Sequence, residues 1–322
     1  MARDKKTREL QVEDELRRRT RLAVPAFAGG FLYLLSSIII SSTLNGAPTV
    51  GLIQGLTPAL SGQASPIESP RTLEIKFVSH HALALVAGGA LGAISFVVLV
   101  LILLLLADAA IYRRPETWSL ARPFVLYGGI AVALATVGHE IVTAIETHHF
   151  AVSSNHSNRA AELALPPVQA PGGATSYEFS NYIGLLASLA LAAGMIGIVL
   201  NALRVGLLPR WMGILGMFTG ILVSPLQLVF GATLQIVPAF WMVMMGILYS
   251  GRWPKPAGAD SGDPPAWASG EARPWPPRAP RGRPAARGAA VATADIAPAA
   301  APPSNGASPR RRRRKRGPGP RR

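Results

Sequence analysis

Long runs of apolar residues constrain the fold of this chain more than any other feature. They lie at about 22–42, 82–107, 123–145, 183–203 and 211–250, and the last has 40 residues without a charge. A helix of about 20 residues crosses the roughly 30 Å hydrocarbon core of a bilayer. The last run therefore predicts a hairpin, 211–229 and 233–250, that turns near Gly231 and Ala232. The expected fold is all-α, a polytopic transmembrane bundle of six helices covering residues 22–250.

Composition agrees with a membrane protein. Of the 322 residues, 49% are hydrophobic and 15% are charged, which is too apolar for an average soluble domain. The chain has no cysteine, which excludes disulfides, Cys-ligated zinc and thiol catalysis. The first apolar run is longer than a signal peptide core and follows a charged segment of 21 residues, so we expect an uncleaved helix.

Lysine and arginine predict how the helices are threaded. Of the 32 such residues, 29 lie in segment 1–21, in the 108–122 loop, beside Pro209 or after residue 250. The other two loops, at about 43–81 and 146–182, contain only Arg71, Lys76 and Arg159. Because cytoplasmic flanks of membrane helices are enriched in Lys and Arg, we expect six spans with both termini in the cytoplasm.

Charged segments flank the apolar runs at both ends of the chain. Segment 1–21 predicts a solvated helix with acid–base pairs four residues apart, namely Glu13–Arg17, Asp14–Arg18 and Glu15–Arg19. From residue 251 the chain is rich in Pro, Gly, Ala and Arg, and this composition predicts a disordered cytoplasmic tail, 251–322.

Seven consecutive cations lie near the end of that tail: Arg310, Arg311, Arg312, Arg313, Arg314, Lys315 and Arg316. Such a run binds anionic headgroups of the inner leaflet, binds nucleic acid by counterion release, or has no specific partner and serves only solubility and topology. A tethered tail always lies within reach of the membrane. Of the two partners, we therefore favour anionic lipid.

The six histidines all fall on the external side of this threading. Candidate ligands for zinc or copper among them and their neighbours are His80, His81, His139, Glu146 and His149. On a helix, His139 and Glu146 share a face with Thr143, and that face is expected to turn toward the bundle, with Glu140 pointing elsewhere. Two other interpretations of these residues remain. They form a polar rim with a structural role only, or they form a site for proton relay or haem ligation.

Catalytic motifs are not found. His139-Glu140 begins the zinc protease pattern H-E-x-x-H, but Thr143 occupies the place of the second histidine. The sequence also has no Gly-rich phosphate loop, no nucleophile elbow and no charge at the middle of a predicted span. These patterns favour a protein that is not an enzyme and has no cofactor, unless zinc or copper binds at the histidines.

Small residues recur four apart inside the predicted spans, at Gly88 and Gly92, Ala193 and Gly197, and Gly216 and Gly220. Small residues let helix backbones approach closely in lipid. We expect them to pack helices of one chain together, with self-association as the alternative.

Two segments carry a resemblance to a known family. NALRVGLLPRWMGILGMFTG (201–220), and YSGRWP (249–254) with PPAWASGEARPWP (264–276), resemble a family of actinobacterial integral membrane proteins with a basic C-terminus. SHHALALVAGG (79–89) through IYRRPE (111–116) is similar in layout. The resemblance implies a bacterial plasma membrane, and a segment with Trp253, Trp267 and Trp275 that lies back on the bilayer or on the bundle. It implies no site.

Taken together, the patterns predict an integral plasma-membrane protein with a structural or interaction role, whose basic tail binds anionic lipid. The alternative is a metal-binding or small-solute transport protein that uses the external histidines.

Overall fold

The computed structural model describes residues 2–48, 69, 71–116, 118–165, 175–223, 235–253 and 264–273. All of them lie in one compact unit, 1–279. Its regular elements are helices, and no strand occurs in the described part of the chain, which confirms the all-α fold.

Four long helices form the body of the protein: α1 (Ala2–Asn45), α4 (Ala82–Arg113), α5 (Ala121–Val152) and α7 (Thr175–Val205). Each contains one of the first four predicted runs and continues beyond it. The shortest of them has 31 residues, about 46 Å at 1.5 Å per residue. By length and composition all four are able to cross a membrane, which indicates a membrane-spanning protein.

Two shorter apolar helices, α8 (Arg210–Val223) and α10 (Ile236–Tyr249), correspond to the predicted hairpin. Each has 14 residues, about 21 Å, which is less than the roughly 30 Å of a bilayer core. The predicted turn near Gly231 and Ala232 lies outside the described residues. Because α8 and α10 are shorter than a bilayer core over their described residues, the count of six spans stays a prediction.

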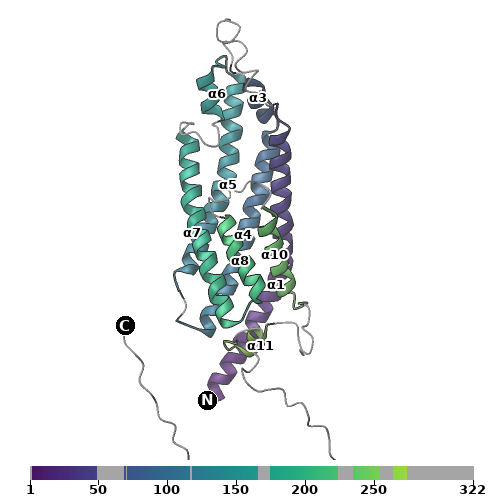
Figure 1. Cartoon of the computed structure of the whole chain (residues 1–322), viewed down its shortest axis with the longest axis vertical. Helices are drawn as coiled ribbons and strands as arrows, with labels where there is room; N and C mark the ends of the chain where they lie inside the picture. Colours follow the sequence, from purple (N-terminus) through teal and green to yellow (C-terminus); the bar gives the residue numbers. More distant parts are fainter. Residues whose placement is uncertain are drawn as a thin grey trace, which may run out of the picture. The chain divides into compact units, whose positions relative to one another are not determined.

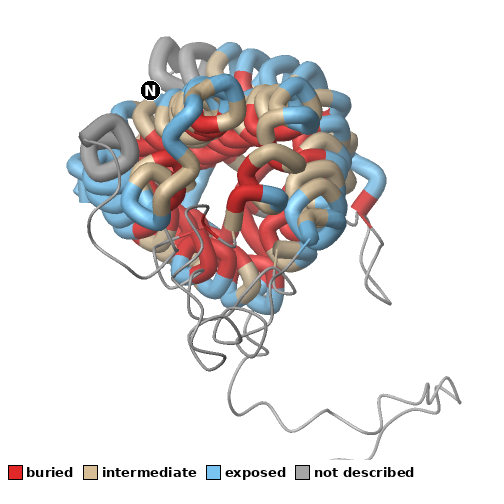
Figure 2. Tube along the Cα trace, turned by 90° about the horizontal axis from the view of Figure 1, so that it is seen from above, coloured by how far each residue is buried: buried red, intermediate tan, exposed pale blue. Residues whose placement is uncertain are grey.

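The four long helices pack side by side in a row, and the two short helices α8 and α10 connect the two ends of this row. Neighbours along the row are α1, α4, α5 and α7, while α10 packs on α1, α8 packs on α7, and α8 and α10 pack on each other (Figure 1). The indole N–H of Trp241 in α10 donates to the backbone oxygen of Met212 in α8, at 3.1 Å. Seen from above, buried residues face the interior of the bundle (Figure 2).

The outer surface of the bundle is strongly apolar. Large hydrophobic side chains are exposed along it, including Val24, Phe31, Leu83, Tyr127 and Leu134. So many exposed apolar side chains would be costly in water, but they are expected for helices that face lipid.

Glycines bring the helices close together, as the small-residue pairs predict. A Cβ on Gly88 or Gly92 of α4 would lie within 3 Å of Ile40 or Ser36 of α1. A Cβ on Gly216 of α8 would lie 2.7 Å from the Trp241 indole nitrogen. These faces are therefore occupied by helices of the same chain.

Short helices lie at the two ends of the bundle. At the histidine end, as we call it, α3 (Thr72–His80) and α6 (Asn158–Ala164) pack beside the end of α5 through Ile75, Phe150 and Ala161. At the opposite end, α11 (Pro265–Ser269) lies beside the N-terminal half of α1 (Figure 1). We call this opposite end, which also contains the end of α4 and the α7–α8 turn, the basic end.

Candidate functional site

The predicted metal ligands are spread over the histidine end. His80 and His81 are exposed where α3 meets α4, and the His81 ring stacks on Phe77 with centroids 4.1 Å apart. On α5, His139 and Glu146 are half-buried, and His149 is exposed. Among the described residues, which include all six histidines, no three His, Asp or Glu side chains come together as a metal site. Zinc or copper binding stays a prediction.

At the histidine end, α5 buries a polar face that agrees with the predicted one at Thr143 and differs from it at Glu140. Thr143 and Thr147 are buried, and their hydroxyls donate to the backbone oxygens of His139 and Thr143, at 2.9 and 2.6 Å. Glu140 was expected to point elsewhere, but a Cβ on Gly89 of α4 would lie 2.7 Å from its Cγ. Glu140 therefore faces α4, because a residue without a side chain leaves space for it there.

The most elaborate polar arrangement in the described residues lies at the basic end. Its centre is Trp267 of α11, which is 1% exposed. Around it are Glu15 and Arg19 of α1, Arg113 of α4 and Tyr249 of α10, and we call these five residues the clasp. They come from four helices that are far apart in sequence, so the clasp joins the start of the chain to the segment that follows the last apolar helix.

The Trp267 ring is held on several sides. The guanidinium carbons of Arg19 and Arg113 lie 5.1 and 5.6 Å from its centroid, within the range of cation–π contacts. Its indole N–H donates to the backbone oxygen of Leu207 in the α7–α8 turn, at 3.0 Å. Tyr249 meets it edge-on, with centroids 6.2 Å apart. One side chain thereby contacts α1, α4, α10 and the α7–α8 turn.

The two arginines of the clasp are buried, and their polar atoms have partners except the Arg113 Nη2, which makes no hydrogen bond. The Arg113 Nη1 lies 2.8 Å from the Glu15 carboxylate, and its Nε donates to the backbone oxygen of Ala266 in α11, at 3.0 Å. Arg19 donates from both Nε and Nη2 to the backbone oxygen of Leu248. Removing a charge from water costs several kcal/mol unless partners replace the water. The clasp supplies a carboxylate, carbonyls and an aromatic face.

The backbone of α11 explains how this short segment reaches its place. Pro264 and Pro265 open the helix, and Gly270 ends it in the left-handed region with φ 65°, where glycine is favoured. A Cβ on Gly270 would lie 2.8 Å from Val12 of α1. The Arg273 N–H then donates to the backbone oxygen of Val205, at 2.9 Å.

Two predictions need correction here. Disorder from residue 251 does not hold for residues 251–253 and 264–273, because Trp253 and Trp267 are buried on the bundle. The rest of the tail, 254–263 and 274–322 with Arg310–Arg316, lies outside the described residues. Segment 1–21 was expected to be solvated, but Glu15 and Arg19 are 7% and 2% exposed. The predicted pairs Glu13–Arg17 and Asp14–Arg18 do form, on the exposed side of α1.

Sequence reasoning missed the clasp because its members are far apart in the chain. A tryptophan in a Pro- and Ala-rich tail was the available signal, since a large aromatic ring gains from burial. Of the tryptophans implied by the resemblance, Trp253 and Trp267 do lie on the bundle, at 8% and 1% exposure. Trp275 is outside the described residues.

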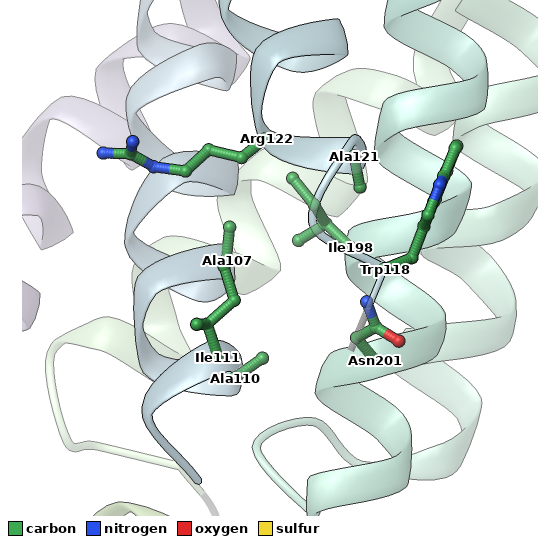
Figure 3. A pocket seen from close by; sticks show the side chains of 8 residues that line it. All are labelled: Ala107, Ala110, Ile111, Trp118, Ala121, Arg122, Ile198 and Asn201. Carbon is green, nitrogen blue, oxygen red and sulfur yellow. The ribbon is translucent and has the colours of Figure 1, made fainter. Parts of the chain in front are cut away.

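A small pocket lies between α4, α5 and α7 near the basic end (Figure 3). Its lining includes Trp118, Arg122, Ile198 and Asn201. Arg122 is paired with Asp108 at 2.9 Å. The cavity volume is about 10 Å³, room for about one water molecule, whereas small-molecule sites usually have several hundred Å³. The pocket does not favour a solute site.

Comparison with protein families, characterised proteins and solved structures finds no match for this chain. The resemblance to actinobacterial membrane proteins therefore stays a prediction.

Proposed function

We propose that this chain is a structural or interaction protein of a bacterial plasma membrane, with six spans and both termini in the cytoplasm. In this proposal its C-terminal run, Arg310–Arg316, binds anionic lipid. The observation that carries the proposal is the clasp, which ties residues 264–273 to the basic end of the bundle. Arg273, the last described residue before that run, therefore lies at the end of the bundle where other Arg residues gather.

Charge at the two ends of the bundle supports the orientation. Arg113, Arg204 and Arg210 lie at the basic end together with the charged part of α1 and with α11. The described part of the histidine end has only Arg71, Lys76 and Arg159 as strong cations. Arg71 and Arg159 pair with glutamates three residues on, Glu74 and Glu162. Under the positive-inside rule, the basic end faces the cytoplasm.

The absence of cysteine allows a direct test of the tail. A fluorophore sensitive to polarity is attached to Ser308→Cys, and the full chain is placed in nanodiscs of phosphatidylcholine alone or with phosphatidylglycerol. We expect stronger, blue-shifted emission in the anionic discs, falling back as salt is raised from 50 to 500 mM, because screening weakens headgroup attraction.

The matched control replaces all seven residues of Arg310–Arg316 by Gln in the same labelled chain. It should give the same emission in both kinds of disc. Equal emission of the unsubstituted tail in both discs would show that the run does not bind anionic lipid.

A further inference from the structure

Two Arg-Trp dipeptides meet at the basic end, outside the clasp. Arg210-Trp211 opens α8 and Arg252-Trp253 follows α10. Their tryptophan rings stack, with centroids 5.7 Å apart and planes 25° apart. Trp253 is the inner ring, and Trp211 is the outer one, 45% exposed. Together with Arg204 near the end of α7, we call these residues the Arg-Trp patch.

Tight turns bring the patch together. The chain reverses after α7 through Gly206, with φ 82°, and leaves α10 through Gly251, with φ 70°. Both values lie in the left-handed region, where glycine has no steric cost. The first turn separates Arg204 from Arg210 by only a few residues, and the second presents Arg252 beside the stacked rings.

The three arginines of the patch are exposed, and no carboxylate of the described residues pairs with them. Arg17 and Arg122, by contrast, are exposed arginines that do pair with a carboxylate. The patch is thus a local excess of positive charge beside a half-exposed tryptophan. Arginine guanidinium groups bind phosphate oxygens well, often through two parallel hydrogen bonds.

An apolar stripe continues from the patch along α8. Ile214 and Phe218 follow Trp211 at spacings of three and four residues, so they lie on one helix face. They are 62% and 43% exposed. A phosphate-binding end joined to an exposed apolar face suits a molecule that has an anionic head and a hydrocarbon chain.

We propose that the Arg-Trp patch is a binding site for an anionic glycerophospholipid. The arginines hold the headgroup phosphate, Trp211 lies at the level of the glycerol, and an acyl chain follows Ile214 and Phe218. Tryptophan and arginine are both enriched where membrane helices meet the headgroups. The inference rests on the proposed membrane orientation, but the site is on the folded bundle and does not need the C-terminal run.

The test compares thermal unfolding of the purified chain in maltoside detergent with phosphatidylglycerol, phosphatidylcholine or inorganic phosphate added. A ligand that binds only the folded state raises its stability. We expect phosphatidylglycerol to raise Tm by several degrees and the other two to have no such effect. The count of phosphatidylglycerol molecules retained in native mass spectrometry provides a second measurement.

Three variants locate the binding. Arg210→Gln with Arg252→Gln should remove most of the phosphatidylglycerol shift and one retained lipid. Arg17→Gln with Arg18→Gln removes two exposed and ion-paired arginines of α1. This control should leave the phosphatidylglycerol shift in Tm and the number of retained lipids unchanged. A chain truncated after Pro309 should also keep the shift.

These variants separate the site from the tail. If the Arg210/Arg252 variant keeps the full shift and the truncated chain loses it, the lipid binds the tail, and the patch proposal fails while the proposed function stands. If inorganic phosphate reproduces the shift, the patch is a general anion site and the lipid assignment is overturned.

Discussion

Replacing Trp267 by alanine tests the clasp most directly. The side chain is 1% exposed, and a buried Trp→Ala change costs about 3–5 kcal/mol. That cost includes the loss of ring contacts with Arg19 and Arg113, which face the indole at 5.1 and 5.6 Å. If the loss falls on the docking of α11, 3 kcal/mol raises the detached fraction about 150-fold, since each 1.4 kcal/mol is a factor of ten.

Cleavage after Glu271 by a glutamyl endopeptidase measures that fraction. The residue is exposed at the end of α11, and the next residues are held by the hydrogen bond from Arg273 to Val205. When opening is fast relative to cleavage, the rate follows the open population. We therefore expect Trp267→Ala in nanodiscs to be cut at this bond about 150-fold faster than the natural chain, as followed by mass spectrometry.

Two further variants sharpen the result. Trp267→Phe keeps an aromatic ring but loses the hydrogen bond to Leu207, a loss of about 1–2 kcal/mol, and should be cut about 5- to 30-fold faster. Ala268→Gln changes the exposed neighbour and should be cut at the natural rate. If Trp267→Ala is also cut at the natural rate, the ring does not hold α11 on the bundle and the argument is wrong.

Three other predictions concern packing, threading and metal binding. Gly128→Ala places a Cβ 2.7 Å from a backbone nitrogen of α7, so it should lower the free energy of unfolding by about 1–3 kcal/mol. A Cβ at Gly138 meets nothing within 4 Å, so Gly138→Ala should be neutral or slightly stabilising. Denaturant titration in micelles measures both variants. Asn155→Cys should react with an impermeant maleimide on intact cells and Arg114→Cys only after permeabilisation; the reverse pattern would invert the threading. If the histidines bind zinc or copper, elemental analysis should find metal above background that His139→Ala reduces; metal at background in both proteins would end that hypothesis.

Much of the fold follows from local sequence. Runs of apolar residues predict the positions of α1, α4, α5 and α7, because a long uncharged segment has few alternatives to a helix in a membrane. Small residues four apart predict where backbones approach, as Gly88 and Gly92 do against α1. Both signals are contained within about 20 neighbouring residues, so no knowledge of the tertiary structure is needed to use them.

The candidate site could not be predicted in the same way. Helical periodicity groups His139 with Thr143, but it cannot say which side of α5 meets α4, and Glu140 proved to face Gly89. The sequence also provided little indication that the two Arg-Trp dipeptides lie together. The stacking of Trp211 on Trp253 depends on how α8 and α10 return to one end of the bundle.

The sequence by itself determined that this is an all-helical protein with long apolar helices and charged ends, because hydrophobicity and length act locally. Only the tertiary structure decided which charges are buried. Glu15, Arg19 and Arg113 are residue types that usually lie on the surface, yet α1, α4 and α10 converge on Trp267 of α11 and these three side chains are removed from water. That outcome depends on partners more than 90 residues apart, whose contacts replace the lost hydration and are visible only when the chain is folded.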